Sequence, residues 1–135
     1  MCYVLNFKVI SVGKTPVSLE EVSETAAQHR LYVSQNGATY RITQGGCSCD
    51  YVLAKGQGIT VASFLRDVLI SPGVKSIEVC WSWGKWNLPV KDIARITLEM
   101  FENRNEAGAL ESECWYRIYD PQKFAAGTER SQSNR

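Results

Sequence analysis

The sequence lacks the features that mark several large classes of protein. No apolar run approaches the roughly 20 residues that a membrane-spanning helix needs. Residues 1–8 have neither the basic start nor the small-residue cleavage site of a secretory signal peptide. The chain has a single histidine, and no combination of side chains suggests acid–base catalysis. We therefore expect a cytoplasmic protein without membrane contact, and we predict no catalytic residue.

The charge is close to neutral. Lysine and arginine total 15 and aspartate and glutamate 14, which gives a net charge of +1. Binding to DNA or RNA depends on the neutralisation of phosphates by clustered basic residues. We therefore expect no nucleic acid partner, while a protein partner stays open.

The length is that of one domain. A chain of 135 residues is long enough to bury a hydrophobic core of its own. We assign residues 1–124 to a single α+β domain. Residues 125–135 are mostly small and polar, and we predict a disordered C-terminal tail.

Hydrophobic periodicity predicts the main elements. Strands are expected at residues 3–12, 31–35, 38–43, 75–83 and 114–119, and helices at 18–28 and 60–70. The first helix has a capping box, with Ser18 at the N-cap and Glu21 three residues later. After Pro89, residues 90–104 fit helical spacing but also alternate in part, and we favour a helix there.

Asn36-Gly37 predicts a β-hairpin with a two-residue type I′ turn. Such a turn sets the register, with Val33 opposite Tyr40 and the strands 31–35 and 38–43 paired around it.

This order of elements predicts a sandwich of helices on a mainly antiparallel sheet. The first four strands and two helices have the β-α-β-β-α-β order of a ferredoxin-like core, which a C-terminal helix and strand would extend. In that arrangement the first strand lies between the third and the fourth strands.

The cysteines give the most specific signal in the chain. Cys47 and Cys49 follow Gly45-Gly46 at the end of the strand 38–43. Crossover connections would bring Cys2, at the start of the first strand, and Cys80, near the end of the fourth, to the same edge. Since neighbouring strands are ~4.8 Å apart, these sulfur atoms could come within ~10 Å of one another. The fifth cysteine, Cys114, is expected at the opposite end.

Two interpretations of this cluster concern its structure. Cys2, Cys47, Cys49 and Cys80 could bind a soft metal such as zinc, which prefers four tetrahedral thiolates. Alternatively they are ordinary buried thiols, because free cysteine is among the most buried residue types.

A third interpretation is a thiol enzyme. Cys47 and Cys49 could form a strained disulfide, or one of them could be an activated thiolate. His29 is the only possible histidine partner, although a histidine at a helix C-terminus is more often a partner of the helix dipole.

A different class of function is protein binding. Trp86 lies in a predicted loop with Gly84 and Lys85, where an exposed tryptophan could anchor a partner. A small, single-domain chain with no catalytic set suits an immunity or inhibitor protein that blocks a toxin or an enzyme.

Several short motifs resemble those of a group of small uncharacterised bacterial proteins. They are Met1-Cys2, Gly46-Cys47-Ser48-Cys49 before an aromatic residue, and a strand that ends Cys80-Trp81. The likeness covers about residues 1–83, and Asp50 departs from it where a glycine is expected. The resemblance implies a bacterial cytoplasmic protein with the four clustered cysteines as its signature. It implies no established reaction.

Overall fold

The computed structural model describes residues 3–43, 57–83 and 91–122, and the predicted tail 125–135 lies outside them. The elements are β1 (Tyr3–Ser11), α1 (Leu19–Gln28), β2 (Tyr32–Asn36), β3 (Thr39–Thr43), α3 (Gln57–Ile70), β4 (Val74–Trp83), β5 (Ala94–Thr97), α4 (Leu98–Glu106) and β6 (Trp115–Tyr119). No helix in these ranges is long and apolar enough to cross a membrane.

The strands form one mixed sheet of six strands in the order β2-β3-β1-β4-β6-β5. Every neighbouring pair is antiparallel except β5 and β6, which are parallel. The predicted α+β class and the mainly antiparallel sheet are confirmed. The full strand order differs from that of a four-stranded ferredoxin-like sheet, because β6 and β5 continue the sheet beyond β4.

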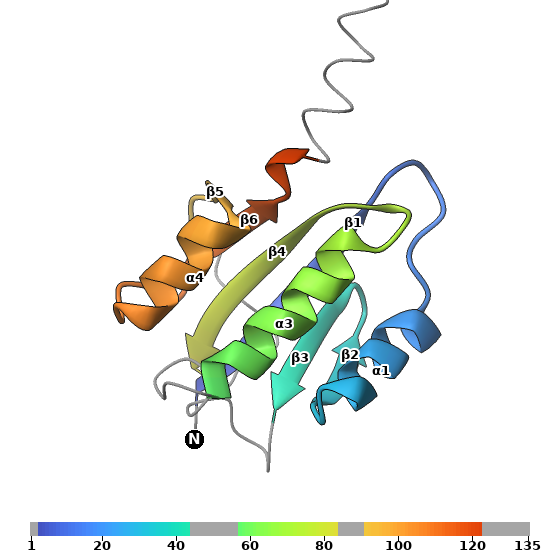
Figure 1. Cartoon of the computed structure of the whole chain (residues 1–135), viewed down its shortest axis with the longest axis horizontal. Coiled ribbons are helices and arrows are strands. Elements are labelled where there is room, and N and C mark those ends of the chain that lie inside the picture. The colour runs from blue at the N-terminus through green and yellow to red at the C-terminus, as the bar shows by residue number, and fades with distance from the viewer. Residues whose placement is uncertain (1–2, 44–56, 84–90, 123–135) are drawn as a thin grey trace, which may run out of the picture.

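The three helices α1, α3 and α4 cover one face of the sheet (Figure 1). Alternate strand residues point into this layer, among them Leu5 and Phe7 of β1 and Ile77 of β4, all at most 1% exposed. The Phe7 ring stacks on Tyr40 with a centroid distance of 4.9 Å and meets the edge of Phe64 at 5.5 Å. The core therefore lies between the central strands and α3.

The first helix begins as predicted. The Ser18 side chain accepts a hydrogen bond from the backbone N–H of Glu21 at 3.3 Å, which satisfies one of the free donors of the first turn. Val22 and Ala26 are the buried residues of α1. At the other end Arg30 adopts a φ of 57°, which ends the helix before β2.

The hairpin has a different register from the predicted one. Val33 lies opposite Ile42, and Gln35 lies opposite Tyr40, so the pairing is displaced by two residues. The turn residues are Gly37 and Ala38, with a φ of 61° at Gly37. A type I′ turn at Asn36-Gly37 would need a positive φ at both residues, whereas Asn36 stays in β2. Because the displacement is even, each side chain keeps its predicted face.

The segment after residue 90 contains a strand as well as the predicted helix. β5 pairs in parallel with β6, with Ile96 opposite Ile118. Thr97 then caps α4, because its side chain accepts a hydrogen bond from the backbone N–H of Met100 at 3.2 Å. The four residues directly before α4 therefore form a short strand in a segment for which a helix is predicted.

We predict that Phe7→Ala lowers the free energy of unfolding by about 3–5 kcal/mol, because it removes a fully buried ring from contact with two others. The control is Tyr32→Ala in β2, where the side chain is 68% exposed and the expected loss is less than about 0.5 kcal/mol. Denaturant titration followed by circular dichroism measures both. Similar losses in the two variants would contradict this description of the core.

Candidate functional site

Three strand ends meet at one end of the sheet. β1 begins at Tyr3, which pairs with Trp83, the last residue of β4. Leu5 lies opposite Ile42, so β3 also ends here, at Thr43. In Figure 1 the arrowheads of β3 and β4 point to this same lower end. The predicted thiol cluster depends on these strand directions.

Of the residues predicted to form a site, only Cys80 belongs to the part of the chain that the structure describes. Cys2, Cys47 and Cys49 lie outside it, as does Trp86, the predicted partner anchor. Within the described ranges, no three histidine, cysteine, aspartate or glutamate side chains come together as a possible metal site.

Cys80 lies on the face of the sheet that the helices leave uncovered. It pairs with Asn6 of β1 on one side and with Trp115 of β6 on the other, three positions before the end of β4. The predicted position near the strand end is therefore correct. β4 has a neighbouring strand on each side, so Cys80 lies in an inner strand of the sheet.

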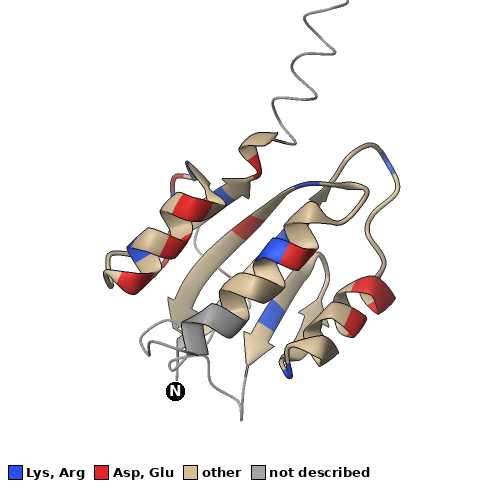
Figure 2. Cartoon of the chain, viewed as in Figure 1, with Lys and Arg blue, Asp and Glu red and all other residues tan. Residues whose placement is uncertain are grey.

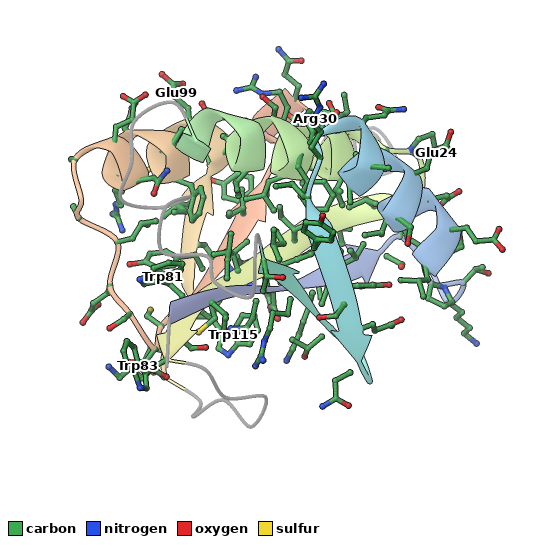
Figure 3. All side chains as sticks on the ribbon, turned by 90° about the horizontal axis from the view of Figure 1, so that it is seen from below. Glu24, Arg30, Trp81, Trp83, Glu99 and Trp115 are labelled. Atoms are coloured by element: carbon green, nitrogen blue, oxygen red, sulfur yellow. The ribbon has the colours of Figure 1, made fainter. Side chains whose placement is uncertain are left out.

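The surroundings of Cys80 are buried, although the helices lie on the other face. Cys80 is 0% exposed, Ser82 1%, Val4 4% and Trp115 5%. Figure 3, in which the helices lie above the sheet, shows Trp115 below it. This end of the uncovered face is therefore shielded from solvent.

Asn6 is the polar centre of this buried region. Its Nδ2 donates to Ser82 Oγ at 2.7 Å and approaches the backbone oxygen atoms of Val4 and Cys80 at 3.3 Å each. Its Oδ1 is buried and has no hydrogen-bond partner among the described residues. A buried amide oxygen without a donor is costly. Alternation along the strand 3–12 separates Asn6 from Leu5 and Phe7, but it gives no sign that the face of Asn6 is buried.

Burial makes the Cys80 thiol a very weak acid. Desolvation, followed by the negative charge of Glu113 and of a Cys114 thiolate, raises the pKa of Cys80 from 9.0 to about 12. The cations Lys8 and Lys91 act in the opposite direction. Reactive cysteines have a depressed pKa and some solvent access. Cys80 has neither, so its environment differs from that of a reactive cysteine.

Cys114 lies at the same end of the sheet as Cys80, and its predicted position at the opposite end is wrong. The neighbouring residue, Trp115, pairs with Cys80, and the backbone N–H of Glu113 donates to Trp81 O at 2.7 Å. The prediction omitted β5. Since β5 is parallel to β6, the crossover through α4 returns the chain to the end at which β5 began.

The side chain of Cys114 nevertheless belongs to a different environment. It forms part of the hydrophobic core, and its Sγ donates to Asp92 O at 3.2 Å. Burial is the main cause that raises the pKa of Cys114. By the alternation of β6, Cys114 and Cys80 belong to opposite faces of the sheet.

His29 pairs with a carboxylate of the neighbouring helix. Its Nε2 lies 2.6 Å from Asp67 Oδ2 of α3, and its ring meets the edge of Phe64. Its backbone N–H donates to carbonyl oxygens of the last turn of α1, including Ala26. These contacts link α1 to α3. The sequence indicated the position of His29 at the helix end but not its partner.

In comparisons with known proteins, no family model, no curated protein and no solved structure matches the chain.

We predict that Cys80 makes the stability of the metal-free protein fall in alkaline solution. Because the folded state holds the thiol proton more tightly, this contribution is fully present below about pH 9 and is lost as the pH rises towards 12. The expected loss is on the order of 1.4 kcal/mol per pH unit within that window. Urea titrations at several pH values measure it.

The comparison protein is Cys80→Ala, which keeps every other titrating group. Its stability should decline less steeply between pH 9 and 12 than that of the unmodified chain. Parallel declines would mean that the Cys80 thiol ionises as easily in the folded state as in the unfolded state.

Proposed function

We propose that the protein binds a soft metal ion, zinc being the best candidate, through Cys2, Cys47, Cys49 and Cys80. The observation that supports this most is the burial of Cys80 beside the end of the sheet where β1 begins and β3 and β4 end. The chain carries the other three thiols directly before β1 and shortly after β3. Four thiolates from three segments would complete the four-coordinate shell of a structural zinc site.

The environment of Cys80 suits a metal ligand better than a free thiolate. A cysteine must lose its proton to bind zinc, and the burial that raises the pKa of Cys80 opposes this loss in the absence of a metal. A bound cation would provide the compensating charge. Metal binding should therefore release protons, and the affinity should rise with pH.

We further propose that β1–β4 with α1 and α3 form a ferredoxin-like core. Support comes from the partial order β2-β3-β1-β4, in which β1 lies between its predicted neighbours. Such a core would leave β5, α4 and β6 as an addition at one side. We also propose a cytoplasmic location, where free thiols stay reduced and available for metal binding.

The thiol-enzyme alternative has less support. Neither Cys80 nor Cys114, the two described cysteines, has the lowered pKa of a catalytic thiolate. An enzyme would need Cys47 or Cys49 as its nucleophile, and both lie outside the described residues.

The test is a zinc titration of the reduced chain. We expect about one zinc ion per chain by elemental analysis after removal of unbound metal. Cys47→Ser/Cys49→Ser and Cys80→Ser should each lower the retained zinc by at least tenfold, because a four-thiolate site loses ligands. Cobalt substitution gives a second readout, since thiolate coordination produces intense charge-transfer absorption.

Cys114→Ser is the matched control, because it removes a buried thiol of the other sheet face. It should retain the zinc content of the unmodified chain, with circular dichroism verifying that every variant is folded. A folded, unmodified chain without zinc would refute the proposal. So would a folded Cys80→Ser variant with undiminished zinc.

A further inference from the structure

Charge is unevenly divided between the two layers of the molecule. The helices α1, α3 and α4 contain seven acidic and two basic residues, whereas the six strands contain five basic residues and one acidic residue. Figure 2 shows acidic residues on both outer helices, α1 and α4. Although the net charge of the chain is only +1, its helix layer is acidic and its sheet is basic.

Four of these charged strand residues form a row on the face without helices. Lys8 of β1 lies opposite Glu78 of β4, Glu78 lies opposite Arg117 of β6, and Arg117 lies opposite Arg95 of β5. We call this row the cationic strip. Since adjacent strands are ~4.8 Å apart, it crosses four strands over roughly 14 Å.

The cationic strip is held in place by contacts of its own. Arg117 donates to Glu78 Oε2 from both Nε, at 3.0 Å, and Nη2, at 2.7 Å. The Lys8 ammonium lies 4.5 Å from the centre of the Trp115 ring. Glu78 is nearly buried, whereas the Arg117 side chain is 33% exposed. The ion pair therefore exposes more of its cation than of its carboxylate to solvent. Binding would therefore immobilise fewer free side chains.

We propose that the cationic strip is a docking surface for a protein partner with an acidic patch. Three cations and one nearly buried carboxylate give the strip a positive surface that complements such a patch. Two of the three cations are arginines, Arg117 and Arg95, and arginine is enriched at the centres of protein interfaces. The chain thus belongs with interaction proteins, whether or not it also binds a metal.

A nucleic acid fits the cationic strip less well. Single-stranded nucleic acids bind by stacking bases on exposed aromatic rings beside basic residues. Trp115, the tryptophan beside the strip, is only 5% exposed and already has Lys8 over its ring. The partner inferred here is therefore a folded protein or an acidic peptide.

The residues outside the described ranges are not rich in negative charge. The residues outside the described ranges include five basic residues, at positions 55, 85, 123, 130 and 135, and only two acidic ones, at positions 50 and 129. Their net charge is positive, so as a group they do not complement the cationic strip.

The experiment measures binding of a fluorescently labelled glutamate-rich peptide to the full chain by anisotropy, at low and at high salt. The peptide should bind saturably at low salt and weaken as salt is added. Lys8→Glu/Arg95→Glu should lower the affinity at least tenfold. Lys14→Glu/Arg104→Glu makes the same change in net charge in a loop and on α4, and it should change the affinity less than about twofold.

A second measurement does not depend on any variant. Amide chemical shifts of the unmodified chain should change on peptide addition along β1, β4, β6 and β5, and not along α1 or α4. Shift changes confined to the helices would overturn the proposal.

Other outcomes are equally decisive. Equal losses in the two double variants would reduce the effect to net charge and overturn the proposal. Tighter binding of a single-stranded DNA oligonucleotide, or of vesicles containing an anionic lipid, would show that the strip prefers a nucleic acid or a membrane to a protein. Either result would overturn the proposal. Self-association at low salt that the strip variant abolishes would support the docking surface and would identify the acidic helix layer of a second copy as the partner.

Discussion

The antiparallel pairing of β1 with β4 is the constraint on which both proposed sites depend. The ladder runs from Tyr3 opposite Trp83 to Ser11 opposite Val74, with one irregularity near its far end. This pairing brings the start of the chain to the end of β4 and sets Asn6 beside Cys80. The same register sets Lys8 beside Glu78. A slip of β1 by one residue would turn Asn6 and Lys8 towards the helices and separate them from Cys80 and Glu78.

The same ladder explains why polar residues occupy the centre of the sheet. Asn6, Ser82 and Glu78 are all at most 7% exposed, on the face that the helices leave uncovered. Burying such groups is costly unless they bond to one another, as Asn6 does with Ser82 and Glu78 does with Arg117. The unmatched Asn6 Oδ1 shows that the described residues do not complete this network.

Local signals in the sequence predicted local structure well. The Ser18 cap and the end of α3 follow from short-range chemistry, and so they are visible in one segment at a time. The errors concern pairing between segments. The hairpin register depended on which two residues took the turn, and the position of Cys114 depended on β5, a strand too short for its periodicity to stand out. The burial around Asn6 and the row from Lys8 to Arg95 depend on strand order, which no single segment encodes.

The proposed metal site requires that sulfur atoms from separate segments meet at the end of the sheet where β1 begins. X-ray absorption at the zinc edge of the zinc-loaded chain measures this most directly, because it reports the atoms bound to the metal. We predict a first shell of sulfur at about 2.3 Å, reduced in sulfur content by Cys80→Ser. A first shell of nitrogen or oxygen at about 2.0–2.1 Å, unchanged in that variant, would show that Cys80 is not a ligand and that the thiols do not meet.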